Sequence, residues 1–257
     1  MENHKELKTV AKFISDFSTC MMAVGAQTSR IERNALRIAK AYHLKAEMLF
    51  FQKTMVMTLW DSRNEHSYSM VSRIKPMPLN FEINARLSHL SWRIHDEHIP
   101  LNRASKLCQR ILARPRVNPW IVLWLVSFAN ASFCRLFHGD FISMAIVFVA
   151  TFIGFFFKQQ MQKWHWNEFA VFILSAMFAS AFGSLGYLCN WGTTPDMALG
   201  TSVLYLIPGV PLINGVMDII DGHIVTGCCR LFNAALLVSC IAIGLSAILF
   251  ITGLVTI

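Results

Sequence analysis

Charged residues are scarce in the second half of this 257-residue sequence, although the chain as a whole is basic. Residues 1–118 hold 19 of the 23 Lys and Arg residues and ten of the 15 acidic residues, a balance of +9. The remaining residues hold four bases and five acids, a balance of −1. A soluble domain needs charge over its whole surface, so this scarcity excludes a soluble fold for residues 119–257 and indicates lipid as their solvent.

Common catalytic and metal-binding motifs are also missing. The sequence has no Walker loop, GxSxG, HExxH or GxGxxG, and its seven cysteines are odd in number and form no CxxC. His89, His95 and His98 are six and three residues apart, a spacing that does not align zinc ligands on one helical face. We therefore expect no enzyme, no metal site, no cofactor and no disulfide framework.

The positive charge of the first part does not indicate nucleic-acid binding, because acidic residues lie between the bases as on an ordinary solvated surface. Residues 1–20 are charged and mixed, without the continuous apolar core of a signal peptide. The densest basic cluster comes directly before the first apolar run, which suits a cytoplasmic membrane flank. It consists of Arg103, Lys106, Arg110, Arg114 and Arg116.

Residues 1–116 predict one small cytoplasmic α+β domain with the element order α-α-β-β-β-α-α. We expect helices at 5–24, 30–42, 80–95 and 100–113, and strands at 48–51, 55–60 and 66–74. Gly25 should end the first helix and Ser29 should cap the second. Asn80 and Pro100 should open the last two helices.

Residues 117–257 predict a transmembrane domain of about five helices. The expected spans are 119–137, 141–157, 168–188, a fourth that starts near Met197, and 232–256, each near the ~20 residues that cross a bilayer. Loop bases alternate in number along the chain, which places the N-terminus in the cytoplasm and the C-terminus outside. Four tryptophans fall at predicted interfaces: Trp120, Trp164, Trp166 and Trp191.

The fourth span is interrupted by a Pro-Gly-x-Pro segment. Pro208 and Pro211 cannot both lie inside a regular helix, and such breaks at membrane depth are tolerated where they line a cavity or are buried in protein. In the helix that follows, Asn214, Asp218 and Asp221 fall on one face, and Ile213, Val216, Met217 and Ile220 fall on the other. This predicts either a broken helix of the kind found at transporter sites or an interfacial helix with its carboxylates in water.

Two segments resemble the threonine/serine exporter family. They are Leu206-Ile-Pro-Gly-Val-Pro-Leu-Ile-Asn214, followed by Asp218, Gly222-His223 and Gly227, and the earlier Gly25-Ala-Gln-Thr-Ser-Arg-Ile-Glu32. The sequence is most similar to the larger subunit of the split, two-component succinate exporters of bacteria. That resemblance implies a multi-pass protein of the bacterial inner membrane that exports small carboxylates together with a small, separately encoded membrane subunit.

The family motif matches residue by residue at Pro208, Gly209, Pro211, Asn214, Asp218 and His223, which we take as candidates for a substrate pathway. The resemblance does not say which of them touch substrate. We add Asn130 in the first span, because an amide in lipid is costly. Gly222 and Gly227 are expected to serve close helix packing. Five helices enclose little space, so either a second subunit or a homo-oligomer is expected to complete the pathway.

Three other functions stay open at this point. One is export of threonine or serine, and another is a membrane-anchored sensor or assembly protein in which residues 1–116 do the work. The third is a membrane-embedded enzyme, for which Asp218, Asp221 and His223 form the single candidate cluster.

Overall fold

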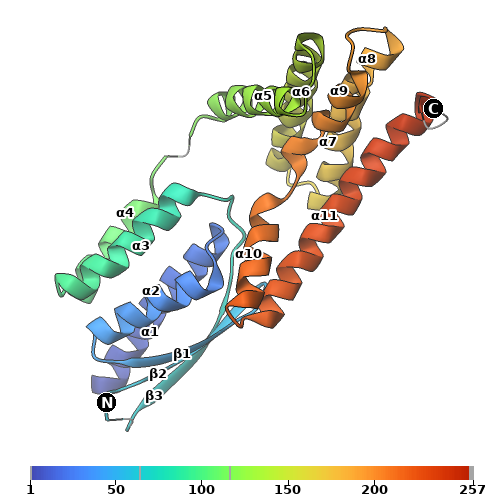
Figure 1. Cartoon of the computed structure of the whole chain (residues 1–257). Helices are drawn as coiled ribbons and strands as arrows, with labels where there is room; N and C mark the ends of the chain where they lie inside the picture. Colours follow the sequence, from blue (N-terminus) through green and yellow to red (C-terminus); the bar gives the residue numbers. More distant parts are fainter. Residues whose placement is uncertain (1, 64, 116, 255–257) are drawn as a thin grey trace. The chain divides into compact units, whose positions relative to one another are not determined.

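The structure is a computed structural model that describes residues 2–63, 65–115 and 117–254 (Figure 1). The chain divides into two compact units, each described by itself below. The first unit consists of Met1–Pro115 and Gly209–Phe232, and the second of Arg116–Pro208 and Asn233–Ile257. The segment 209–232, which we assigned to the transmembrane part, is thus grouped with the N-terminal elements.

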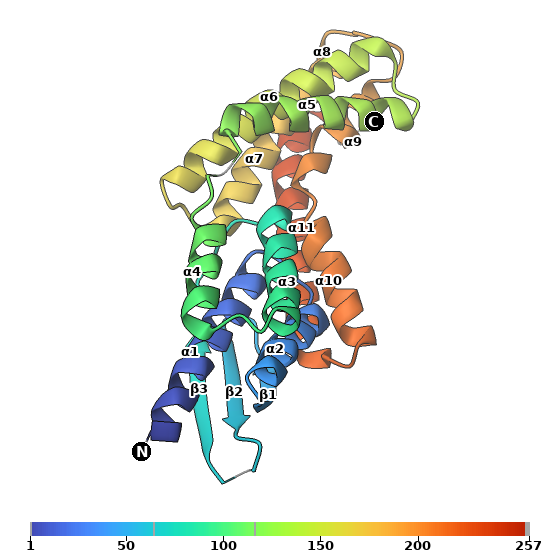
Figure 2. The ribbon, with the colours of Figure 1, turned by 90° about the vertical axis from the view of Figure 1, so that its left-hand side faces the viewer.

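The first unit is a three-layer α+β arrangement with its elements in the predicted order. A three-stranded antiparallel sheet is formed by β1 (Lys45–Phe50), β2 (Thr54–Trp60) and β3 (Ser67–Arg73), with β2 in the centre. Helices α1 (Glu2–Ala23) and α2 (Thr28–Ala41) pack on the sheet, and α3 (Phe81–Asp96) and α4 (Leu101–Leu112) pack on those helices (Figure 2). In this register Met48 pairs with Met57, and Met57 with Met70.

The core of the first unit follows from the apolar periodicity of these elements. Alternate residues of β2 are buried, and α1 and α2 bury one stripe each against the sheet. The largest fully buried side chains here are Ile14, Phe17, Met21, Ile31, Ile38, Met55, Met57, Leu59, Leu87 and Ile94.

Gly25 and Asn80 mark helix boundaries as predicted. Gly25 has φ of +92° after α1, and the Asn80 side chain accepts a hydrogen bond of 3.0 Å from the Ile83 N–H at the start of α3. His98 has φ of 49° just after α3. Ser29 was expected to cap α2, but this is wrong: α2 already begins at Thr28, and its N-cap residue Gln27 makes no side-chain cap.

The second unit is built from long apolar helices. These are α5 (Pro119–Leu136), α6 (Phe141–Lys163), α7 (Glu168–Gly183), the short α8 (Leu185–Leu188), α9 (Pro195–Ser202) and the single 3₁₀ turn η1 (Leu204–Leu206). The described residues include four helices long and apolar enough to span a membrane, or five if one interrupted pair counts as one span. The fourth helix of that set is α11 (Ile224–Ile251), which begins eight residues before the predicted 232.

The predicted break in the fourth span is present. The helical segment Pro195–Leu206 ends before helix α10 (Gly209–Ile220) begins, so the apolar run is not one continuous helix. Pro208 lies in the break, and Pro211 lies in the first turn of α10, where its missing N–H leaves no helical hydrogen bond unmade.

Two loops of the second unit are joined by hydrogen bonds. Asp140 caps α6 by accepting from the Ser143 N–H at 2.7 Å, and its other carboxylate oxygen accepts from the Thr193 N–H at 2.5 Å. The Asp140 N–H donates to the Thr194 hydroxyl at 2.9 Å. The α5–α6 loop and the 189–194 loop therefore lie at the same end of this unit, as the alternating loop charges require.

The Asp140 contacts predict a pH-dependent stability. The Thr193 N–H and then the Ser143 N–H hold the pKa of the Asp140 carboxyl well below its usual 3.8. A lowered carboxyl pKa stabilises the fold above the pKa of the unfolded chain, and this stabilisation is lost as the pH falls below it. The gap in Tm between wild type and Asp140→Asn should therefore narrow between about pH 7 and about pH 3.

Thermal unfolding of detergent-solubilised protein measures this gap. Asp196→Asn, which removes an exposed carboxylate from the first turn of α9, is the matched control. A Tm gap for Asp140→Asn that is constant over this pH range would contradict the assignment.

Candidate functional site

Helix α10 presents its polar face to the loop between α1 and α2. Asn214, Asp218 and Asp221 follow at i, i+4 and i+7, as predicted, and all three bond to residues 25–29 of the same compact unit. The Asn214 amide donates to the Gly25 carbonyl at 3.0 Å. The two signature segments, about 190 residues apart in sequence, therefore form one site.

Asp218 is the centre of this site, and its side chain is fully buried. One carboxylate oxygen accepts from the Thr28 N–H at 2.9 Å, and the other accepts from the Thr28 hydroxyl at 2.8 Å. Thr28 is the first residue of α2, which has no acidic residue in its first turn. Asp218 thus caps α2 from a distant part of the chain and places a negative charge at the positive end of that helix.

Arg230 supplies the balancing positive charge. Its Nη1 lies 3.1 Å from an Asp218 oxygen, an ion-pair distance without an aligned hydrogen bond, and its Nη2 donates to the Ala26 carbonyl at 3.1 Å. The pair is nearly closed to solvent, with 13% of the Arg230 side chain exposed. Burying one of these charges without the other would be costly, so the two residues act as a unit.

Weaker polar contacts surround this buried pair. Asp221 is exposed and accepts from Gln27 at 3.0 Å and from the Ser29 hydroxyl at 2.5 Å. His223 Nε2 lies 3.2 Å from a Glu32 oxygen. Further along, Thr226 of α11 donates to the Phe50 carbonyl at 2.7 Å, which ties the same segment to the end of β1.

These contacts bear on one part of the interfacial-helix alternative, which placed both carboxylates in water. Asp218 is buried and bonded to Thr28, contrary to that expectation, whereas Asp221 is exposed. The opposite face of α10 is the solvent-accessible one: Ile213 and Ile220 are 66% and 70% exposed, and Val216 and Met217 are also exposed.

Two glycines of this segment have different roles. A Cβ on Gly227 would come within 2.6 Å of the Gly215 carbonyl oxygen and of Ile219, so α10 and α11 touch at this point. Gly222 was expected to serve packing too, but a Cβ there would meet no atom within 4 Å. Its φ of +90° shows that it is needed instead for the left-handed turn between α10 and α11.

Asn130 and Pro208 belong to the second unit. The Asn130 amide donates to the Thr151 hydroxyl at 2.6 Å and to the Thr201 carbonyl at 3.0 Å, so this buried polar group is satisfied by α6 and α9. Pro208 is buried, and Gly209 is half-buried. Within the residues that the structure describes, no three His, Cys, Asp or Glu side chains gather as metal ligands would.

Sequence reasoning missed the partners of the polar face. Thr28 and Arg230 were not predicted to take part, Gln27 and Glu32 were noted for their resemblance to a family motif without a role, and Ser29 was predicted only as a helix cap. The signal was present as two separate segments, but local periodicity cannot show that they meet.

The long apolar helices and the interrupted fourth span are those of a multi-pass membrane protein. The sequence profile of the family described as "Putative threonine/serine exporter" matches residues 12–252. The chain belongs to this threonine/serine exporter family.

Curated relatives are similar in sequence over different shares of their length. The "Probable succinate transporter subunit YjjP" of Escherichia coli is 36% identical over 52% of this chain and 53% of its own length. The protein of the same name from Klebsiella aerogenes is 24% identical over 97% of this chain and 96% of its own. "Pheromone-regulated membrane protein 10" of Debaryomyces hansenii is 23% identical over 87% of this chain but only 22% of its own. No solved structure matches the chain significantly.

The buried pair predicts strong coupling between Asp218 and Arg230. Asp218→Asn or Arg230→Gln alone should lower the free energy of unfolding by about 3–5 kcal/mol, because each leaves the partner charge buried and unpaired. The double variant should cost less than the sum of the two, as measured by denaturant unfolding in detergent. Asp221→Asn, at an exposed carboxylate, should cost under about 1 kcal/mol. Strict additivity at 218 and 230 would contradict the pairing.

Close packing at Gly227 predicts a different kind of loss. Gly227→Ala should destabilise the protein by about 1–3 kcal/mol because a new methyl group must displace the α10 backbone. Gly200→Ala in α9, where a Cβ would meet nothing within 4 Å, should be neutral or stabilising in the same unfolding assay. Equal effects at the two positions would argue against the contact.

Proposed function

We propose that this chain is one subunit of an exporter of small carboxylates, with succinate-like dicarboxylates as substrates, in the bacterial inner membrane. The observation that carries the proposal is the break in the fourth apolar span at Pro208, followed by a helix whose carboxylates bond to the α1–α2 loop. Broken helices recur at the binding sites of secondary transporters, because they free backbone groups at membrane depth. The succinate transporter names of the YjjP relatives support this choice of substrate.

The predicted pathway residues take two different roles in this proposal. Pro208, Gly209 and Pro211 form the break that substrate passes, and Asn130 stays a predicted pathway residue of the second unit. Asn214, Asp218 and His223 are positioning residues, because their polar groups bond to the α1–α2 loop or to Glu32 and hold the helix that follows the break. Substrate would then contact the break rather than the Asp218 carboxylate.

A small multi-pass membrane subunit completes the transporter in our proposal. The word "subunit" in the names of both bacterial relatives supports a partner of this kind. The exposed apolar face of α10 is suited to lipid or to such a partner. We place residues 1–116 in the cytoplasm and the C-terminus in the periplasm, following the distribution of Lys and Arg between loops.

Export of threonine or serine is the second candidate, and the family's description favours it. Cells that lack the gene and its partner should retain labelled succinate if the first proposal holds, and labelled threonine or serine if the second does. Re-expression of both proteins should restore efflux. Unchanged efflux of all three compounds would refute both candidates.

The break itself predicts a selective loss of transport. Pro208→Ala with Pro211→Ala should let the helix continue across the break, lowering the efflux rate by tenfold or more (~1.4 kcal/mol or more in the transport barrier) while membrane insertion is unchanged. Pro78→Ala with Pro195→Ala changes an exposed loop proline and the first residue of α9, and serves as the control. Normal efflux by the first pair would exclude the break from the pathway.

A further inference from the structure

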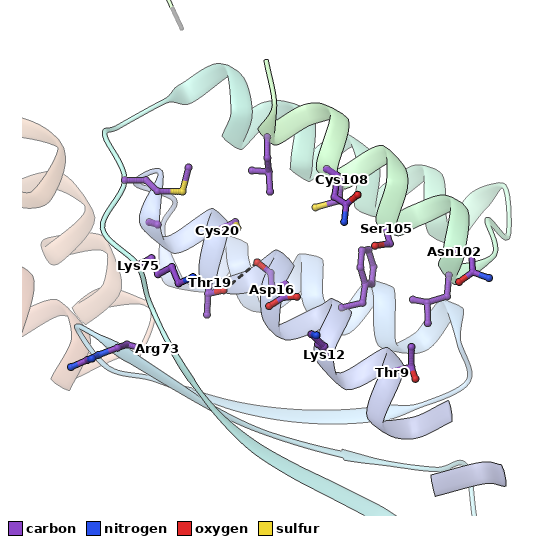
Figure 3. A pocket seen from close by; sticks show the side chains of 16 residues that line it. Thr9, Lys12, Asp16, Thr19, Cys20, Arg73, Lys75, Asn102, Ser105 and Cys108 are labelled. Carbon is purple, nitrogen blue, oxygen red and sulfur yellow. Dashed lines mark hydrogen bonds between the residues drawn. The ribbon is translucent and has the colours of Figure 1, made fainter. Parts of the chain in front are cut away.

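The first unit contains a cavity of about 550 Å³ that lies away from α10. Its walls are α1, α4 and the segment that follows β3, as Figure 3 shows. Pockets that hold small molecules typically have volumes of about 300–1,000 Å³. The cavity is therefore large enough for a metabolite. None of the residues that bond to α10 lines it.

The charges around this cavity are unbalanced. Lys12, Arg73 and Lys75 line it with one acid, Asp16. None of these four side chains forms an ion pair with another residue in the described part of the chain. In Figure 3, Lys75 extends toward Thr19 on α1, whereas Arg73 is turned outward. All four charged side chains are exposed, so the mouth of the cavity has an excess of positive charge that an anion from solution can meet.

The remaining lining combines apolar surface with hydrogen-bonding groups. Phe13, Met77, Leu101 and Leu112 provide the apolar part, and Thr19, Asn102, Ser105 and Gln109 provide hydroxyl and amide groups. A neighbouring cavity of about 800 Å³ has the opposite character, because Glu6 and Asp61 line it without any Lys or Arg. The positive character is therefore specific to the first cavity.

We propose that this cavity binds a small organic dianion, a dicarboxylate or a phosphate monoester, as a regulatory site of the protein. Lys12 and Lys75 bind the two negative charges, and the apolar wall at Phe13 and Met77 packs against the body of the ligand.

Short stretches of chain connect the cavity to the contacts between α10 and the α1–α2 loop. Its α1 wall ends at Ala23, two residues before Gly25, whose carbonyl accepts from Asn214. Its other wall continues from Met77 to Asn80, whose N–H donates to the Val24 carbonyl at 3.1 Å. A ligand that draws Lys12 and Lys75 together therefore acts on two segments, the end of α1 and residues 77–80, which meet next to the loop that bonds to α10.

Calorimetric titration of the full-length protein in detergent tests the site. The probes are succinate and adenosine monophosphate, with succinamide and adenosine as their uncharged counterparts. At least one dianion should bind, the uncharged compounds should not, and the responding probe identifies the ligand as carboxylate or phosphate. Lys12→Gln with Lys75→Gln should weaken binding at least about tenfold, because two charge-assisted hydrogen bonds are lost.

Lys8→Gln with Lys106→Gln is the matched control, since it removes two exposed lysines from α1 and α4 that do not line the cavity. This variant should bind as the wild type does. The proposal is overturned if neither dianion binds the wild type, or if the control loses as much affinity as the cavity variant. Succinate is also the proposed export substrate, so the cavity is tested by the difference between the Lys12→Gln/Lys75→Gln variant and the wild type, and equal binding by the two overturns the proposal.

Discussion

The structure of the first unit depends on one buried carboxylate, that of Asp218. Helix α2 begins without a side-chain cap of its own, and its first N–H groups would be left unsatisfied beneath α10. Asp218 accepts from both the N–H and the hydroxyl of Thr28, and Arg230 keeps that charge from being buried alone. With α2 capped in this way, the loop carbonyls of Gly25 and Ala26 are placed to accept from Asn214 and Arg230. Every other polar contact between the two segments lies around this pair.

Much of the fold was predictable because it follows from local patterns. The alternation in β2, the helical stripes of α1 and α2, and the caps at Gly25 and Asn80 are all signals within a few residues, and the elements appear where they indicate. The apolar runs gave the spans for the same reason. The errors lie at boundaries where tertiary contacts override local preference. Ser29 reads as a cap in sequence, but its hydroxyl donates to Asp221, and α11 begins early because Thr226 and Gly227 pack within the first unit.

The candidate site was predictable in one half only. The sequence correctly placed Asn214, Asp218 and Asp221 on one face of α10. It did not show that this face meets the α1–α2 loop, because a carboxylate in a membrane protein suggests a pathway unless its partners are known. Those partners are Thr28 and Arg230, and no periodicity connects residue 28 with residue 218. The family signature marked both segments, and only the structure shows why both are needed. The motif resembles a transport site in sequence, but its buried carboxylate, Asp218, caps helix α2.

The sequence separation between Asp218 and Thr28 has a consequence for biogenesis. The ribosome releases residues 1–115 long before residues 209–232 exist, and the apolar helices of residues 119–206 are made in between. Until then α2 lacks its cap, and the first unit is unfinished while its neighbours enter the bilayer. The contact of Asp218 with Thr28, which completes this unit, can therefore form only after the intervening chain has been synthesised. A chain that stops before residue 218 would leave the N-terminus of α2 without this cap.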